Sequence, residues 1–279
     1  MLGRRCKVES SCHGLVLISN ECSKFLMNLI TSEAIKLQPF GFFKAFFEHY
    51  VHVLGYNDTN VDYKIVTILC CRARLEPELP KTKVDVYSVK TKTWKSLPDS
   101  SYDHYESFES FGYGQDGVLL NGYVHLLATD NQTQVSSPAP TVTTVFNLTH
   151  ERFDKVVPSP KDIANIHCGR LTTCGGCLAL ILCYYYYDFD VWVMKDCGVQ
   201  ESWTRFTIAC RPYGGFSGFR PTYLLSDDKV VFVVDCWKWV ALTPSSGVWR
   251  DLEMVGFPNE NVYDILTFKE SLLSPNYGS

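Results

Sequence analysis

Apolar and polar residues alternate in short runs along most of this chain, and each run ends in residues that favour turns. In residues 84–98, an alternating segment is followed by a polar turn, the aromatic residue Trp94, and a hydrophobic residue beside a proline. Alternation with a period of two is typical of a β-strand that buries one face. These residues are therefore predicted to form a hairpin of two strands.

The same pattern recurs along the chain. Further copies occupy residues 144–158, 190–206 and 239–252, and a weaker copy at 26–37 precedes them. Alignment of the copies places the following residues at one equivalent position: Ala34, Trp94, Phe153, Trp203 and Trp249. Their spacings of roughly 60, 60, 50 and 46 residues fall in the range of β-propeller blades.

A second strand pair is predicted ahead of several copies, in residues 14–19, 118–127 and 223–234. In the second of these, the turn is Asn121-Gly122. Asn-Gly between apolar runs is a strong hairpin signal, because a type I′ turn needs positive φ at both central residues. Two hairpins per repeat make four strands, which is the content of one propeller blade.

The repeat predicts an all-β, kelch-like β-propeller that fills a single domain, residues 1–279. Division of the chain length by the usual blade size predicts about six four-stranded blades. Residues 262–273 are expected to close the ring beside an N-terminal strand. Only residues 23–47 mix strand and helix periods, so no long amphipathic helix is expected.

Composition narrows the class of partner. The net charge is -4 and no Lys/Arg-rich run occurs, so a nucleic-acid partner is not expected. No N-terminal segment resembles a signal peptide, and no apolar run approaches the roughly 20 residues of a membrane helix. We therefore expect no membrane partner and a cytoplasmic or nuclear location, in which the twelve cysteines stay reduced and mostly buried.

The residues that usually carry chemistry do not form a recognised site. Cys174-Gly175-Gly176-Cys177 has the spacing of a metal or redox motif, but a zinc site needs a second, matching pair. A glycine-rich turn entering a core strand is the favoured interpretation. The seven histidines are scattered without a triad or metal pattern. We expect no catalytic residues, no cofactor and no metal.

Several short motifs occur in the order found in one protein family. They are Cys12-His13-Gly14-Leu15-Val16, Met27-Asn28-Leu29-Ile30-Thr31, Gly55-Tyr56-Asn57-Asp58, Asp62-Tyr63-Lys64-Ile65-Val66, Asn121-Gly122-Tyr123-Val124-His125 and Glu201-Ser202-Trp203-Thr204. With the segments between them, they cover nearly the whole chain, which resembles the F-box-associated domain of plant F-box proteins. The first motif resembles the strand that opens the family's domain.

The resemblance has departures. Leu29 stands where the family has proline, and Met27 and Leu126 stand where it has tryptophan. In the family, an F-box of about 45 residues, the size of a small helical module, precedes this domain. Nothing in the chain matches an F-box.

The resemblance implies a non-enzymatic protein-binding module, the substrate-recognition domain of a receptor in a cullin-type (SCF) ubiquitin ligase. Its partners would be a target protein for ubiquitination and, only if an F-box is supplied elsewhere, the ligase adaptor. One alternative is an F-box-less fragment or paralogue that binds targets without recruiting the ligase. Another is a propeller enzyme with a central-channel site, which would need His, Asp or Glu at equivalent positions of several repeats.

Aromatic and arginine residues in predicted loops are the candidates for target binding, because Tyr, Trp and Arg dominate protein-binding hot spots and loops on a rigid scaffold carry recognition. Core packing is the alternative role for such side chains. The predicted binding residues are Tyr185 and Tyr187 at the end of a strand, and Arg211, Tyr213, Phe216, Phe219 and Arg220 in a Gly/Pro-rich loop.

Overall fold

The structure is a computed structural model of the chain. It describes residues 7–20, 23–39, 49–70, 82–98, 103–104, 117–129, 141–157, 159–160, 166–184, 188–209, 219–226, 229–234, 238–243, 246, 248–252 and 270–276. These residues form antiparallel sheets in which strands that follow one another in the sequence lie side by side.

The first two sheets come from the N-terminal third of the chain. The first sheet contains β1 (Lys7–Cys12), β2 (Leu15–Ser19), β3 (Lys24–Asn28) and β4 (Ala34–Lys36). The second sheet contains β5 (His49–Asn57), β6 (Asp62–Cys70), β7 (Thr82–Ser88) and β8 (Thr93–Ser96). In each of these sheets the spatial order of the strands is their order in the sequence.

Three further sheets follow. The third contains β10 (Val118–Leu120), β11 (Tyr123–Thr129), β12 (Thr141–Asn147) and β13 (Arg152–Val157), with the short strand β9 (Asp103–His104) paired to β11. The fourth contains β14 (Ile166–Cys174), β15 (Cys177–Tyr184), β16 (Asp188–Met194) and β17 (Trp203–Ala209), with a 3-10 turn, η2 (Gln200–Ser202), before β17. The fifth contains β18 (Phe219–Ser226), β19 (Lys229–Val234), β20 (Lys238–Thr243) and β21 (Val248–Leu252).

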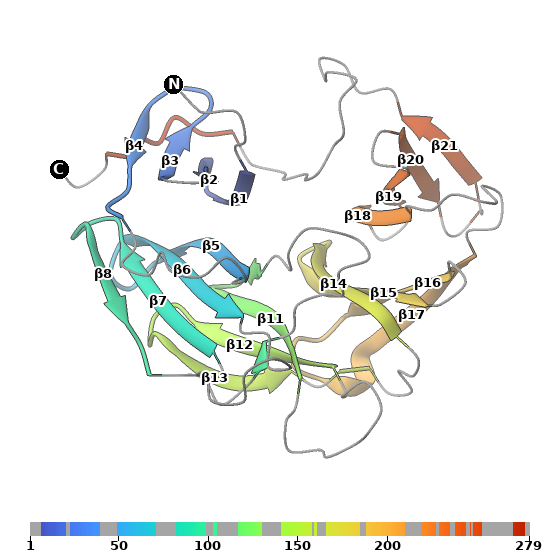
Figure 1. The fold of residues 1–279 in the computed structure, drawn as a ribbon. Helices are drawn as coiled ribbons and strands as arrows, with labels where there is room; N and C mark the ends of the chain where they lie inside the picture. Colours follow the sequence, from blue (N-terminus) through green and yellow to red (C-terminus); the bar gives the residue numbers. More distant parts are fainter. Residues whose placement is uncertain are drawn as a thin grey trace.

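The sheets follow one another around a curve in sequence order, with each first strand nearest the middle and each fourth strand outside (Figure 1). The first strands of successive sheets contact one another: β1 contacts β5, β5 contacts β10, β10 contacts β14, and β14 contacts β18. The fold is therefore all-β and propeller-like, as the repeat predicted.

The repeat position is structurally equivalent in all five sheets. The aligned residues lie in the fourth strand of each sheet, opposite a residue at the end of the third: Ala34 opposite Met27, Trp94 opposite Tyr87, Phe153 opposite Phe146, Trp203 opposite Met194, and Trp249 opposite Leu242. The repeat therefore identifies one sheet per copy.

The prediction of about six blades was wrong, because the described residues form five sheets. The prediction of a sixth blade came from dividing the chain length by a typical blade size. Eleven residues separate β6 from β7, and eleven separate β11 from β12, so these repeats are longer than that size assumes. The number of repeat copies was a better guide than the chain length.

The core lies between neighbouring sheets. One cluster of buried side chains joins the first and second sheets, around Leu17, Leu54 and Ile65. A second joins the second and third sheets, around Val66 and Phe146. A third cluster, which includes Leu180 and Trp203, joins the third and fourth sheets.

Strand β6 packs against both of its neighbouring sheets through alternating residues. Tyr63 and Ile65 belong to the cluster shared with the first sheet, whereas Val66 and Ile68 belong to the cluster shared with the third. Successive side chains of a strand point to opposite faces, so a strand between two neighbouring sheets is buried on both. A slip of one residue in register would exchange the two faces.

The turn predicted at Asn121-Gly122 has the expected backbone. Asn121 and Gly122 join β10 to β11 with φ of 51° and 77°, which is the type I′ requirement for positive φ at both positions. His13 and Gly14 have φ of 48° and 88° and join β1 to β2. The family resemblance implied that the motif beginning at Cys12 is the opening strand. It is instead the hairpin turn that joins β1 to β2, and β1 is the strand that comes first.

The C-terminal segment 270–276 lies against the first sheet. The side-chain amide of Asn28 donates hydrogen bonds to the main-chain oxygens of Ser271 and Leu273, each at 2.8 Å. Residues near the two ends of the chain are thus joined, but 270–276 do not form a strand, and closure of the ring by residues 262–273 stays a prediction. Residues 262–269 lie outside the described part.

The described residues also contain no helix with the length and apolar character that crossing a membrane would need.

Candidate functional site

Most of the residues predicted to bind a target cannot be placed. Tyr185 and Tyr187, between β15 and β16, and Arg211, Tyr213 and Phe216, between β17 and β18, lie outside the described residues. Their role in binding therefore stays a prediction.

Phe219 and Arg220 are the first residues of β18, paired with Val234 and Val233 of β19. The prediction that these two residues belong to a loop was wrong. The proline that indicated a loop, Pro221, lies in the strand beside a register shift between Pro221 and Tyr223. A bulge of this kind lets a strand continue past a residue that has no amide hydrogen to donate. The side chains of Phe219 and Arg220 are outside the described part.

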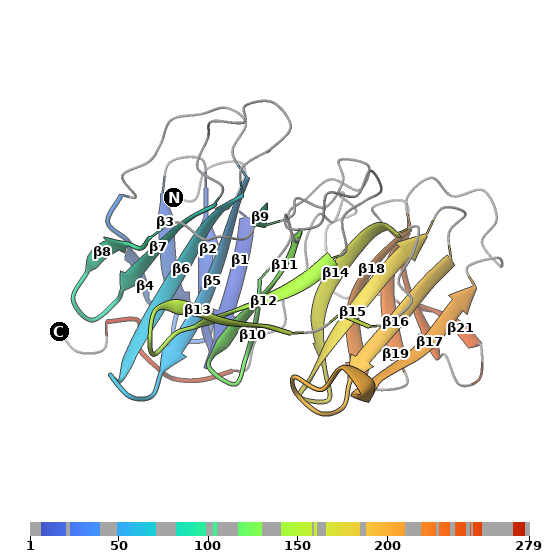
Figure 2. The ribbon, with the colours of Figure 1, turned by 90° about the horizontal axis from the view of Figure 1, so that it is seen from below.

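The tight turns of the sheets lie on one edge of the propeller. Strands of an antiparallel sheet alternate in direction, so the turn after each first strand and the turn after each third strand share an edge. This turn edge comprises residues 13–14, 29–33, 58–61, 89–92, 121–122, 148–151, 175–176 and 195–202. Several of these turns and the segment 270–276 lie along the lower edge of Figure 2. The strand ends beside the predicted binding residues lie at the opposite edge.

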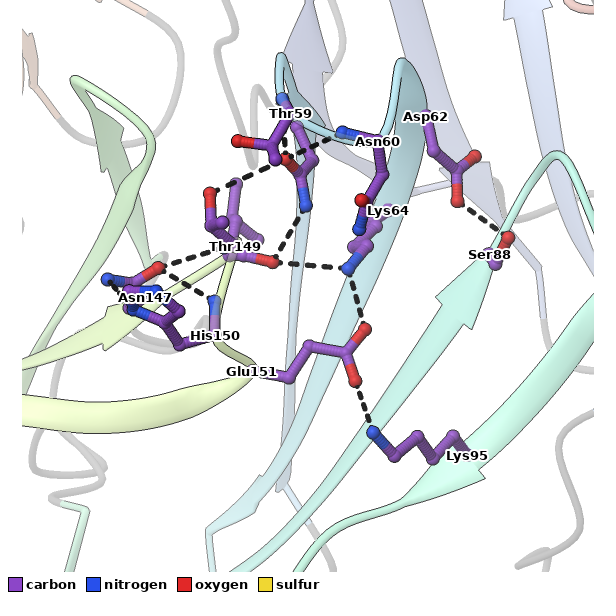
Figure 3. A network of polar contacts seen from close by, with 12 residues as sticks. Thr59, Asn60, Asp62, Lys64, Ser88, Lys95, Asn147, Thr149, His150 and Glu151 are labelled. Atoms are coloured by element: carbon purple, nitrogen blue, oxygen red, sulfur yellow. Dashed lines mark hydrogen bonds and ion pairs between the residues drawn. The ribbon is translucent and has the colours of Figure 1, made fainter.

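A network of polar contacts joins the second and third sheets at the turn edge (Figure 3). The ammonium group of Lys64, in β6, is buried and donates to the main-chain oxygen of Leu148 at 3.2 Å and to Oε1 of Glu151 at 2.6 Å. The second carboxylate oxygen of Glu151 accepts from Nζ of Lys95, in β8, at 2.6 Å. A carboxylate from the third sheet therefore bridges two lysines of the second.

The charge on Glu151 depends on these lysines. Burial by itself raises the pKa of this carboxyl, but hydrogen bonds and charge attraction from Lys64 and Lys95 together outweigh burial and hold the pKa below its ordinary value. Lys64 is a charge buried in an apolar strand, and such a charge is costly unless it is paired. Glu151 supplies the opposite charge that Lys64 needs, and the pair fixes how the second and third sheets meet.

Asparagines at strand ends complete the network. Asn57 ends β5 and is buried; its Oδ1 accepts from the main-chain nitrogens of Thr59 and Asn60, and its Nδ2 donates to the oxygen of Leu148 at 3.3 Å. An asparagine that caps its own turn in this way fixes the turn and leaves the amide nitrogen for another segment. Asn28 is arranged similarly, since its Oδ1 accepts from the nitrogen of Ile30 and its Nδ2 binds the C-terminal segment.

The turn edge also gathers exposed apolar side chains. Seven large hydrophobic side chains are exposed among the described residues, and Val8 in β1 lies away from this edge. The other six lie in its turns, at the start of β21 or in the segment 270–276: Leu29, Ile30, Val61, Val199, Val248 and Leu272. Exposed apolar side chains that gather on one face mark sites of interaction more often than scattered ones.

The cysteine motif is a hairpin turn. Cys174 and Cys177 are opposite each other at the ends of β14 and β15, and Gly175 and Gly176 have φ of 55° and 78°. The interpretation of a glycine-rich turn entering a core strand is confirmed, since residues 178–182 of β15 are buried. In the part of the chain that the structure describes, no three His, Cys, Asp or Glu side chains are placed to hold a metal ion.

One other thiol has a perturbed ionisation. Burial raises the pKa of the Cys12 thiol to about 11. The thiolate, and not the thiol, is the nucleophile, so this cysteine is not activated near neutral pH.

Comparison with known proteins now identifies the family. The F-box associated beta propeller domain matches residues 5–268. The chain belongs to this family. The resemblance seen in the ordered motifs is therefore confirmed over nearly the whole F-box-associated propeller.

Curated relatives of this propeller are plant F-box proteins. It is 29% identical to F-box protein CPR1 of Arabidopsis thaliana, over 72% of this chain and 49% of that protein. It is 25% identical to F-box protein At3g07870 of the same plant, over 90% of this chain and 67% of that protein. The chain thus spans about half to two thirds of the length of these relatives.

Solved structures resemble the propeller only distantly. An oligogalacturonate lyase from Vibrio parahaemolyticus matches with a TM-score of 0.44 and 11% identity, over 86% of this chain and 62% of that one. A likeness at this level carries no inference about activity.

The polar residues that join the sheets of this F-box-associated propeller were not among the predicted site residues. Lys64 has a visible signal, because it is the one charged residue in the mostly apolar run 63–69. A charge at such a position predicts a buried partner. Nothing in the sequence identifies Glu151 as that partner, since 87 residues separate the two.

Proposed function

We propose that this chain is the substrate-recognition domain of a receptor in a cullin-type (SCF) ubiquitin ligase. The observation that carries the proposal is the match of the F-box-associated family to residues 5–268, together with relatives that are F-box proteins. In this function the propeller binds the protein to be ubiquitinated, and the ligase adaptor binds the F-box.

The proposed role is binding and not catalysis. The polar groups of the turn edge whose contacts are described are engaged in holding sheets and turns together, as Lys64 and Glu151 are. The propeller itself would contact the target protein, and contact with the adaptor would need an F-box. We propose a cytoplasmic or nuclear location, which a fluorescent fusion protein would test.

Two versions of the protein test this function in plant cells. One is the chain itself, and the other is the chain preceded by the F-box of one of its F-box relatives. Both versions should capture the same target proteins, but only the version with the F-box should co-purify the ligase adaptor and shorten the lifetime of those targets in a proteasome-dependent way. Equal target lifetimes in cells expressing either version would contradict a substrate-recognition role.

We also propose that residues at the edge opposite the turn edge take part in target binding. Arg220→Ala should weaken capture of those same targets about tenfold, because arginine is enriched among interface residues that dominate affinity. The melting temperature should stay within about 2 °C of the original, as for a surface substitution. Unchanged capture would remove Arg220 from the binding surface.

A further inference from the structure

Three exposed aliphatic residues lie in two segments that the side chain of Asn28 joins at the first sheet. The Leu272 patch consists of Leu29, Ile30 and Leu272, whose side chains are 42%, 45% and 81% exposed. Leu29 and Ile30 belong to the turn between β3 and β4, whereas Leu272 comes from the C-terminal segment. The patch is therefore assembled from the two ends of the chain.

Hydrogen bonds of the Asn28 side chain bring the two segments together. Nδ2 of Asn28 donates to the oxygens of Ser271 and Leu273, which flank Leu272, at 2.8 Å each. Oδ1 of the same asparagine accepts from the nitrogen of Ile30 at 2.8 Å. One buried side chain therefore holds both halves of the patch.

The segment 270–276 is positioned without help from Leu272. Leu273 packs against the core cluster of the first and second sheets, and Oγ of Ser271 donates to the main-chain oxygen of His13 at 2.9 Å. The side chain of Leu272 is the most exposed large hydrophobic in the described part of the chain. A leucine presented to water on a fixed main chain is suited to docking, because little further ordering is needed on binding.

Each of the two segments of the patch also carries an exposed glutamate. Glu33 is exposed, and its main-chain oxygen accepts from the nitrogen of Asn28 at 2.9 Å, while the exposed Glu270 immediately precedes Ser271. Neither carboxylate has an ion-pair partner among the described residues. A partner with cationic side chains beside its apolar ones would complement this surface.

The same charges disfavour a second copy of the chain as the occupant. In a two-fold dimer, the same patch of both copies meets itself. Such a contact through the Leu272 patch would bring Glu33 and Glu270 of one copy close to those of the other. Like charges facing each other across an interface cost free energy and select against that partner.

We propose that the Leu272 patch docks a segment of the target protein that carries aliphatic side chains next to lysine or arginine. The inference rests on the proposed function, and it adds a second contact surface to the one predicted at the opposite edge of the propeller. Aliphatic side chains of the target would cover Leu29, Ile30 and Leu272, and its cations would face Glu33 and Glu270. This is the usual arrangement of an apolar centre with a polar rim.

The test uses the purified chain and an array of immobilised dodecapeptides. All peptides share the same number of aliphatic residues, and the remaining positions hold lysine and arginine, aspartate and glutamate, or serine. The chain should bind the cationic class best. Leu272→Asp should weaken this binding about tenfold, since it places a charge at the centre of the contact.

Two matched variants sharpen the test. Val199→Asp introduces the same carboxylate at an exposed residue in the turn between β16 and β17 of the fourth sheet and should leave peptide binding unchanged. The double variant Glu33→Lys/Glu270→Lys should move the preference from the cationic to the acidic class. Equal binding of all three classes, or binding unaffected by Leu272→Asp, would overturn the proposal. So would a dimer, measured by sedimentation, that Leu272→Asp dissociates.

The outcome is separable from that of the ligase experiment. Peptide binding is measured without an F-box or an adaptor, so it stands even if no target is degraded in cells. Conversely, if the version with the F-box degraded its targets equally well with and without Leu272→Asp, the ligase role would stay intact and the patch would be removed.

Discussion

A single buried lysine shows how one residue constrains two sheets. Lys64 lies in a strand that is buried on both faces, and its charge is tolerated because Glu151 and the oxygen of Leu148 meet it there. Glu151 has φ of 51°, so the turn that carries it adopts a left-handed conformation. Such a backbone is uncommon for a residue other than glycine, and the two ion pairs compensate for it.

Glu151→Gln should destabilise the protein by about 2–3 kcal/mol at pH 7, because it leaves a buried ammonium without an opposite charge. The pKa of Glu151 is lower in the folded than in the unfolded protein, so its contribution is present above the ordinary pKa of 4.5 and is lost as the pH falls further. The difference between the two proteins should therefore shrink between pH 7 and pH 3.5, as measured by urea unfolding.

Lys95→Met is the control for this measurement. It removes the exposed partner of the same carboxylate and should cost about 1 kcal/mol or less, as exposed ion pairs do. If the Glu151→Gln difference were the same at both pH values, the carboxylate would not be the group that stabilises the contact.

At the scale of the element, the strands pack where small residues allow close approach. Gly55 lies in β5, and a Cβ atom built on it would clash with the side chain of Leu148 and lie only 3.2 Å from that of Leu119, both in the third sheet. Leu148 is 1% exposed and has little room to move. The glycine thus lets the edge of one sheet approach the next.

Gly55→Ala should destabilise the protein by about 1–3 kcal/mol, since it overpacks a filled contact between two sheets. Leu148→Ala alone should also destabilise, by about 2–5 kcal/mol, because it opens a cavity. The double variant Gly55→Ala/Leu148→Ala should lose less stability than the sum of the two single losses. Thermal or urea unfolding of the original protein, the two single variants and the double variant would measure this. Additive losses would mean that Gly55 and Leu148 do not compete for the same space.

At the scale of the whole molecule, the two ends of the chain meet at the first sheet. The amide of Asn28 is fully buried. Its partners Ser271 and Leu273 follow it in the chain by 243 and 245 positions. This contact fixes the C-terminal segment on the sheet where the chain begins. It also creates the Leu272 patch.

Removal of residues 270–279 should destabilise the protein by about 2–4 kcal/mol, from two lost hydrogen bonds and the apolar contact of Leu273. Asn28→Ala in the full chain should produce part of this loss, and the two changes together should cost less than their sum. Melting temperatures of the four proteins test this. A truncated chain with an unchanged melting temperature would show that the segment does not hold the first sheet.

The strand repeat, the Asn121-Gly122 turn and the family were predictable from the sequence, because each depends on residues near one another in the chain. Alternation, turn residues and the equivalent aromatic position are local patterns, and the order of the motifs identified the F-box-associated family. The binding residues were predicted from residue type and from their place in predicted loops or at a strand end. Of these, Phe219 and Arg220 lie in β18, because pairing with β19 overrides the loop signal of Pro221.

The partner of Lys64 and the Leu272 patch were decided only by the tertiary structure. Each depends on contacts between residues far apart in the chain, such as Asn28 with Ser271 or Lys64 with Glu151. A local pattern states that a strand is buried or that a turn is tight, but it does not state which distant segment covers it. That choice follows from how the sheets pack around the curve, where burial and hydrogen bonding must be satisfied together.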